Sequence, residues 1–136
     1  MVFEVYDTER LTAWKEFRDS LEDSNTPFDD VIELWSKAPF VNSYLNPHHP
    51  ASWPDPWHLM LDGKYDDLGL VLGMLHTLKL TQRFEHSKFE LYSTLNNNST
   101  TYFLIVDSYI VLNFEYKQLI YKNDLPDIIS NLLWAC

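Results

Sequence analysis

The sequence predicts a single α+β domain, in which N-terminal helices and a buried central helix pack on an antiparallel sheet of three or more strands. Apolar residues recur at helical spacing up to residue 83, and from residue 88 they alternate with polar residues as in strands. The chain has 136 residues, of which 46% are hydrophobic and 15% aromatic, as expected for one folded domain. Residues 1–51 are expected to form a helical and proline-rich part. Residues 52–136 are expected to hold the central helix, a β-meander and a short C-terminal helix.

Two helices are predicted before the central one. In the first, Asp7 or Thr8 is the expected cap, and an apolar stripe follows at helical spacing: Leu11, Trp14, Phe17 and Leu21. The second begins at Thr26-Pro27, because proline is favoured at the first helical position, and runs to about residue 37. Five prolines then fall between residues 38 and 56 among aromatic residues. This composition indicates an ordered loop that lies on the core.

The middle of the chain contains the longest apolar helix signal. Residues 65–83 read YDDLGLVLGMLHTLKLTQR, with aliphatic side chains on one face and most of the remaining circumference, so we expect this helix to be buried on nearly all sides. Gly69 and Gly73 are four residues apart and leave a notch, into which we expect the backbone of a strand to pack. A short helix precedes this one, with Ser52 or Asp55 as its cap.

Past residue 83 the apolar period changes from helix to strand. Alternation predicts strands over residues 88–95, 102–106 and 109–114, with a polar tip at 96–101 and a tight turn at Asp107-Ser108. Residues 115–121 are expected to continue as a further or bent strand. A last helix is expected to start at residues 123–126 and to bury four aliphatic side chains: Ile128, Ile129, Leu132 and Leu133. Core burial is expected for three tryptophans: Trp14, Trp35 and Trp134.

The charge balance limits the classes of partner. The formal net charge is −10, and residues 1–67 hold 14 acidic and 5 basic residues. Such a field repels phosphate backbones, so direct binding of nucleic acid is disfavoured and a basic protein surface is favoured. The apolar run of the central helix is interrupted by His76 and Lys79 and is shorter than a bilayer requires, so no membrane association is expected.

No cofactor and no metal site are expected. His48 and His49 lie near His58, but adjacent side chains of an extended segment point to opposite sides, and no cysteine or carboxylate lies at the spacing of a zinc finger. Cys136 is the only cysteine, so an internal disulfide is excluded, which favours a reducing compartment. The N-terminal residues do not have the basic and apolar pattern of a secretory signal, so a cytoplasmic origin is expected.

Two segments resemble the core of the transglutaminase-like and papain-like thiol enzymes. Gly63-Lys64-Tyr65-Asp66-Asp67 is similar to the Gly-x-Cys-x-Asp element that opens their central helix, and residues 102–121 are similar to their strand, turn and strand. The resemblance implies that Tyr65 stands at the nucleophile position and Asn113 at the position of the Asp that orients the catalytic His. That His would fall near residues 99–101, which read Ser-Thr-Thr. Because this chemistry requires a thiolate and a base, the resemblance implies a degenerate copy without catalytic residues.

The amino-acid sequences of two segments also resemble those of small acidic proteins of unknown activity from tailed bacteriophages of marine cyanobacteria. These segments are DTERLTAWKEFRDSLE and WPDPWHLMLDGKYDDLG. This resemblance implies a virion structural component or an assembly factor. The expected location is then the host cytoplasm during synthesis, and the virion afterwards.

We therefore expect a non-enzymatic protein-interaction module. Aromatic anchors and a carboxylate rim are expected to form its surface: Tyr44, Trp53 and Trp57 as anchors, with Asp55, Asp62, Asp66 and Asp67 as the rim. An alternative interpretation of Asp66 and Asp67 is purely structural: both carboxylates lie at a helix start and complement the positive end of the helix dipole. Two alternatives remain. One is a degenerate or cryptic hydrolase that uses Asp66 or Asp67 with His58 or His76, and the other is an acidic inhibitor of a host DNA-binding protein.

Overall fold

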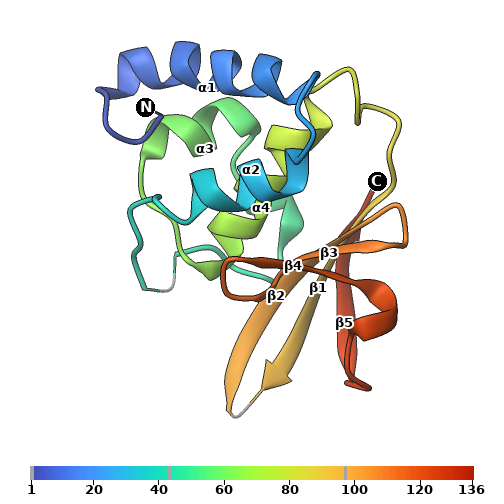
Figure 1. Ribbon diagram of the computed structural model, residues 1–136. Helices are drawn as coiled ribbons and strands as arrows, with labels where there is room; N and C mark the ends of the chain where they lie inside the picture. The colour runs from blue at the N-terminus through green and yellow to red at the C-terminus, as the bar shows by residue number, and fades with distance from the viewer. Residues whose placement is uncertain (1, 43, 97) are drawn as a thin grey trace.

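The fold is α+β, as expected, with helices packed on one face of an antiparallel sheet (Figure 1). It is seen in a computed structural model that describes residues 2–42, 44–96 and 98–136. The helices are α1 (Asp7–Leu21), α2 (Pro27–Trp35), α3 (Pro56–Asp62) and α4 (Asp67–Lys79), with short 3-10 turns η1 (Pro50–Ser52) and η2 (Lys122–Asp124). The strands are β1 (Phe89–Asn96), β2 (Ser99–Val106), β3 (Ile110–Glu115), β4 (Gln118–Tyr121) and β5 (Ser130–Ala135).

The sheet has the order β4-β3-β2-β1-β5, and each neighbouring pair is antiparallel. The β2–β3 turn is the tight turn predicted from the sequence: Asp107 and Ser108 have φ of 52° and 59°, both positive as in a type I′ turn, and the Tyr109 amide donates to the Val106 carbonyl at 3.1 Å. β1 and β2 pair from Phe89↔Val106 to Asn96↔Ser99, so β2 starts earlier than predicted and the polar tip is shorter. Residue 97 of that tip lies outside the described residues.

The expectation of a buried central helix is confirmed. Nine of the 13 residues of α4 are buried, and the helix contacts α2, α3 and β2. Asp66 forms the N-cap of α4 through a hydrogen bond from the Gly69 amide, so the helix begins where the acidic pair predicts. α3 likewise begins after the predicted cap Asp55 and ends at Gly63, whose φ of 69° is the left-handed conformation that glycine adopts without strain.

The glycine notch of α4 is filled by a side chain, and the predicted strand backbone is wrong. A β-carbon at Gly73 would lie 2.2–2.4 Å from three carbons of the Trp35 ring, so the indole occupies the space that the glycine leaves. The N–H groups of Trp14 and Trp35 both donate to the Thr77 hydroxyl at 3.0 Å. That hydroxyl in turn donates to the Gly73 carbonyl at 2.6 Å. Both tryptophans are buried, as predicted.

The predicted C-terminal helix is wrong. Residues 130–135 form the edge strand β5, which pairs with β1, and the amide and carbonyl of Phe89 exchange hydrogen bonds with those of Cys136. Ile129 is 90% and Leu132 is 54% exposed, so two of the four expected core residues lie at the surface. The outer edge of β1 requires backbone partners, and this pairing overrides the short helical period. Trp134 is partly buried against the core.

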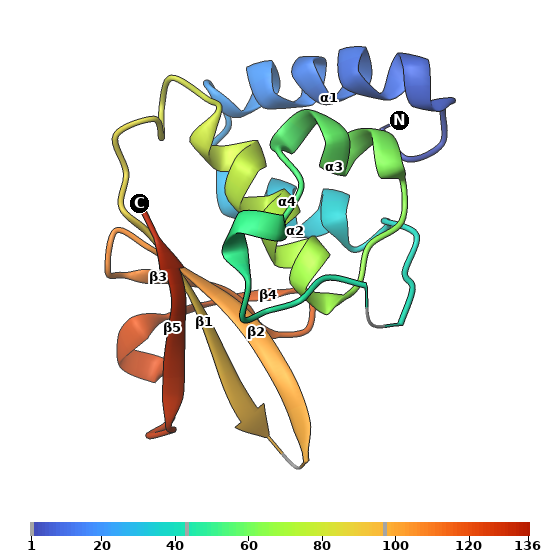
Figure 2. The ribbon, with the colours of Figure 1, turned by 180° about the vertical axis from the view of Figure 1, so that it is seen from behind.

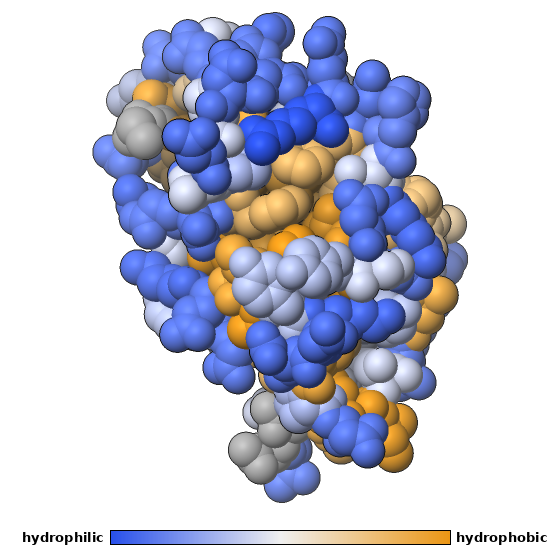
Figure 3. Space-filling model, turned by 45° about the vertical axis from the view of Figure 1, so that its right-hand side comes forward, coloured by the Kyte–Doolittle hydropathy of each residue, from blue (hydrophilic) through white to orange (hydrophobic). Residues whose placement is uncertain are grey.

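Both faces of the sheet are covered over part of their length. The helices cover one face, and on the other a second apolar cluster of Phe103, Ile105 and Val111 lies beneath the segment from Leu125 to Ile128. The free end of the sheet exposes Leu95, which is 71% accessible, together with Ile129 and Leu132. Figure 3 shows hydrophilic residues over the helical end of one face, hydrophobic residues in the middle of that face, and a further hydrophobic group at its lower right. Among the described residues, no helix is long and apolar enough to cross a membrane.

Candidate binding cleft

A cleft lies where the N-terminal end of α4 meets the ends of β2 and β3 and the segment that joins α2 to α3. Figure 2 shows this segment running past that end of α4 and beside β2. The cleft consists of two hollows, and Phe40 and Asp67 line both. The apolar hollow has a volume of about 330 Å³ and is lined mainly by apolar residues, among them Ile32, Trp35, Ala38, Leu70 and Met74, together with Asn113 and the charged residues Glu115 and Lys117. The polar hollow has a volume of about 430 Å³ and includes Asn42, Leu45, Asp66, Ser99, Thr100 and Tyr102.

Asp66 shapes one wall of the cleft. Its carboxylate is 6% exposed, and Oδ1 accepts the Gly69 amide at 2.8 Å while Oδ2 accepts the amides of Tyr44 and Leu45, each at 2.8 Å. Three N–H donors satisfy a buried carboxylate that would otherwise be costly. Asp66 therefore holds the loop around residue 44 against the start of α4, and its oxygens are occupied within the chain.

Asp67 differs from its neighbour because its side chain is exposed in the cleft. It is the first residue of α4 and lines both hollows. Partial burial and the negative charge of Asp66 raise the pKa of Asp67. The hydrogen bonds and ion pairs of the described residues include none made by the Asp67 carboxylate. The Asp67 carboxylate is therefore not neutralised within the described part of the chain, and Glu115 and Lys117 are further charged residues in the lining of the apolar hollow.

Tyr65 belongs to the core and lines neither hollow. Its ring is 0% exposed and makes edge-to-face contacts with Trp35 at 5.0 Å and Phe3 at 5.6 Å. The hydroxyl donates to the Met60 carbonyl over a long 3.4 Å. Burial raises the pKa of Tyr65 to about 12. The backbone of Tyr65 also forms an isolated parallel bridge to Phe40, which fixes the near wall of the cleft.

Asn113 and the start of β2 meet at the far wall. Asn113 has a φ of 70° and donates from Nδ2 to the Tyr102 carbonyl at 2.8 Å, beyond the last regular β2–β3 pair at Leu104↔Leu112. Burial and then the charges of Asp66 and Asp67 raise the pKa of Tyr102. The segments on which the thiol-enzyme resemblance rests are therefore brought together at one cleft.

The predicted anchors do not form one continuous site in the cleft. Tyr44 is 48% exposed, and its hydroxyl donates to Asp62 at 3.3 Å beside the polar hollow. Trp57 is 45% exposed, but its ring packs at 5.8 Å against Trp14 on α1. The indole N–H of Trp53 donates to the Asn46 carbonyl at 2.7 Å, so this partly buried ring joins two parts of the proline-rich loop.

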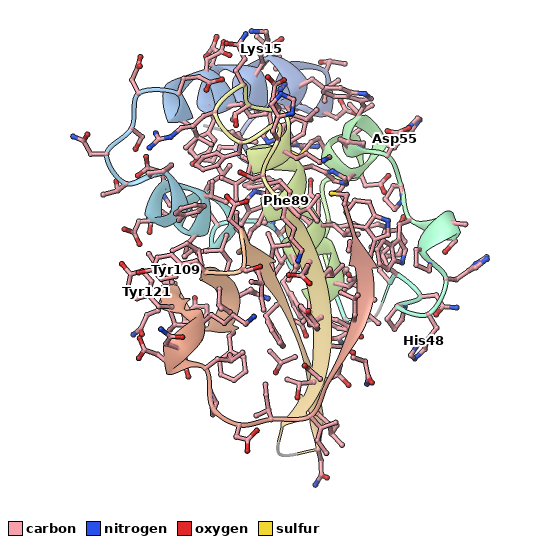
Figure 4. The ribbon with its side chains drawn as sticks, turned by 90° about the vertical axis from the view of Figure 1, so that its right-hand side faces the viewer. Lys15, His48, Asp55, Phe89, Tyr109 and Tyr121 are labelled. Carbon is pink, nitrogen blue, oxygen red and sulfur yellow. The ribbon has the colours of Figure 1, made fainter. Side chains whose placement is uncertain are left out.

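Asp55 is used as a helix cap. It accepts the His58 amide at 2.9 Å and contacts the His58 ring at 2.7 Å, and these bonds lower the pKa of Asp55. Figure 4 shows His48 extending away from the ribbon on the side of the molecule opposite Tyr109. Among the described residues, no group of three or more His, Cys, Asp or Glu side chains is arranged to hold a metal ion.

The acid–base pair required by the cryptic-hydrolase alternative is not formed among the described residues. His58 contacts Asp55, and His76 lies nine residues after Asp67 on the same helix, which is about 14 Å along the axis. Burial lowers the pKa of His76 to about 4. His76 lines a separate hollow with Trp53, Leu72 and Trp134.

Sequence reasoning missed Phe40 and Tyr102 as parts of this site. Phe40 is 55% exposed and stands between the two hollows, but its position follows a proline-rich loop whose path has no periodic signal. Tyr102 comes directly after the residues 99–101 at which the resemblance places the catalytic His. That adjacency is the signal that could have identified it.

Comparison with known proteins finds a solved structure of similar fold. No protein-family model and no curated protein matches the sequence. Among solved structures, calcium-bound LapG of Legionella pneumophila is similar, with a TM-score of 0.67 and 15% sequence identity over 94% of this chain and 74% of LapG. LapG is a protease of the transglutaminase-like and papain-like kind. The resemblance is confirmed at the level of the fold, and the phage resemblance stays a prediction.

Proposed function

We propose that the chain is a non-catalytic interaction protein built on a transglutaminase-like fold, and that its cleft binds a protein partner. The observation that carries this proposal is the environment of Tyr65. The sequence resemblance assigns this residue to the nucleophile position, and its ring lies in the core with its hydroxyl turned toward the Met60 carbonyl. A group in that environment cannot reach a substrate held in the cleft.

The ionisation of Tyr65 supports the same proposal. With a pKa of about 12, only about one phenol in 10⁵ is ionised at pH 7. Acyl transfer of the thiol-enzyme type requires an activated nucleophile with a base within hydrogen-bond reach. Tyr65 meets neither condition among the described residues, because its one side-chain hydrogen-bond partner is a backbone carbonyl.

The other two positions of the constellation also favour binding over catalysis. Asn113 directs its amide to the backbone of Tyr102, where an orienting residue of a thiol enzyme would hold an imidazole. The polar hollow presents the side chains of Ser99, Thr100 and Tyr102 instead. Hydroxyls and a carboxylate on a preformed wall are groups that recognise a polar ligand.

Two assays on the purified chain test this proposal. Unfolded casein and a glutamine-bearing protein with a fluorescent amine serve as substrates for proteolysis and amide transfer, with papain and a transglutaminase as positive controls. We expect no turnover above the buffer control. Turnover that is proportional to protein concentration and is abolished by Asp67→Asn or Tyr102→Phe would refute the proposal.

We further propose that the partner is a component of a tailed-phage particle or of its assembly pathway. The support is the sequence resemblance to small acidic phage proteins, together with a net charge of −10 that favours a basic surface. Mass spectrometry of purified particles and of the infected-cell lysate tests this proposal. Finding the chain in the particle supports a virion role, and finding it only in the lysate, free of any phage protein, contradicts both roles.

A further inference from the structure

We infer that the cleft holds an extended polypeptide segment, with a Lys or Arg side chain at Asp67 and a neighbouring apolar side chain in the hollow beside Phe40. This inference rests on the proposed function and names its partner class. Its basis is the geometry of the two hollows and the charge that lies between them.

The two hollows have different chemistry and share a boundary. Phe40 and Asp67 line both, so a ligand that crosses this boundary passes from a mainly aliphatic and aromatic surface to one of hydroxyls and carboxylates. The volumes of about 330 and 430 Å³ each fall within the range of ligand pockets in proteins. Each hollow is therefore large enough to hold a side chain together with part of its backbone.

The charge at the boundary selects a cation. The exposed Asp67 carboxylate makes no ion pair among the described residues, and Asp66 behind it adds charge of the same sign. Glu115 and Lys117 also line the apolar hollow, and their opposite charges leave the cleft lining net negative. An ammonium or guanidinium group at this point would be attracted by both carboxylates while bonding to one. The Tyr102 hydroxyl, whose phenol is influenced by the same two charges, lines the wall where such a group would sit.

The apolar hollow distinguishes a polypeptide from a free amine. Ile32, Leu70 and Met74 line it, and Phe40 at its edge is 55% exposed. A small amine held at Asp67 would leave this surface uncovered. Successive side chains of an extended chain point in opposite directions at a rise of about 3.3 Å per residue, so one segment can place a basic group and an apolar group on the two sides of the boundary.

Short fluorescent peptides test the inference by anisotropy. The probes carry a central Lys, Arg or Gln with Leu on either side, and a further probe carries Lys between glycines. We expect Lys and Arg probes with Leu to bind about tenfold more tightly than the Gln probe, and the difference to shrink at high salt. The Lys probe flanked by glycine is expected to bind more weakly than its Leu counterpart.

Variants assign the binding to the cleft. Asp67→Asn is expected to weaken Lys-probe binding to the level of the Gln probe. Asp7→Asn is the matched control, because Asp7 is also the first residue of a helix and the charge change is identical. Phe40→Ala is expected to remove the advantage of Leu, whereas Tyr6→Ala, at an aromatic residue that is 82% exposed outside the cleft, is expected to leave it unchanged.

Each other outcome overturns the inference. Equal binding of Lys and Gln probes, or an equal effect of Asp67→Asn and Asp7→Asn, shows that Asp67 does not select a cation. Competition by butylamine as effective as that by the Lys–Leu peptide shows an amine site without a polypeptide partner. If none of the probes binds, the inference is also refuted. The peptide-binding results do not depend on the turnover assays, so the proposed function and the inference fail separately.

Discussion

Replacing Gly73 with alanine tests the packing at the centre of the fold. The added β-carbon would lie 2.2–2.4 Å from three carbons of Trp35, whereas carbon atoms in contact are separated by about 3.5–4.0 Å. The indole would have to move by more than about 1 Å to restore that separation. Its hydrogen bond to Thr77, now 3.0 Å long, would be strained or lost.

We expect Gly73→Ala to lower the free energy of unfolding by about 2–4 kcal/mol. Overpacking costs about 1–3 kcal/mol and an unsatisfied buried donor about 1–3 kcal/mol, while alanine returns about 1 kcal/mol of helix propensity. Urea unfolding followed by circular dichroism measures the change. Gly69→Ala is the matched control, because its β-carbon meets only the Asp66 carboxylate oxygen at 3.1 Å and more distant atoms of Tyr65. If the two variants prove equally stable, Trp35 does not fill the notch.

Three further predictions concern buried polar groups. Thr77→Val leaves two indole donors without an acceptor and should cost about 2–4 kcal/mol in urea unfolding, whereas Thr77→Ser should be nearly neutral; equal losses contradict the shared hydroxyl. Burial lowers the pKa of His76 from 6.5 to about 4, so its contribution to stability is present above pH 6.5 and is lost as the pH falls toward 4. The loss should be roughly 2–3 kcal/mol and should be absent in His76→Gln, and an unchanged pH profile in that variant refutes it. Asp66→Asn places an amide where an acceptor is needed and should speed hydrogen exchange at the Tyr44 and Leu45 amides, whereas Asp67→Asn should not. Equal protection of these amides in both variants would show that Asp66 does not hold the loop around residue 44.

The local sequence pattern predicts a helix or strand correctly when its secondary structure does not depend on which other elements pack against it. α4 is apolar on nearly all sides, so it forms a buried helix whichever elements surround it. β5 has no such independence. Its residues carry apolar side chains at spacings that suit a helix, and only the unpaired edge of β1, some forty residues earlier, makes it a strand. The same limit applies to Gly73, because the crossing of α2 over α4 decides that Trp35 fills the notch.

The candidate site also depends partly on local sequence and partly on contacts between residues that are distant in the sequence. In the sequence Asp66 and Asp67 are equivalent acids at a helix start, and both satisfy the helix dipole. Their separate roles depend on a loop that brings the amides of Tyr44 and Leu45 to one carboxylate and leaves the other facing the cleft. The two segments that resemble thiol enzymes meet at the cleft. The resemblance carries no information on Phe40, whose place depends on the path of the proline-rich loop.

Under the proposed function, the environment of Tyr65 accounts for a fold of the thiol-enzyme kind that carries no thiol-enzyme chemistry. A catalytic nucleophile has to be exposed in a polarised site, which uses strained or poorly satisfied groups that do not favour stability. In this chain the corresponding position holds a fully buried aromatic ring in contact with Phe3 and Trp35, and its backbone is bonded to the loop that forms the cleft wall. The residue therefore contributes to the packing of the core. The backbone of Tyr65 also fixes the wall of the cleft in which we propose that Asp67 recognises a partner.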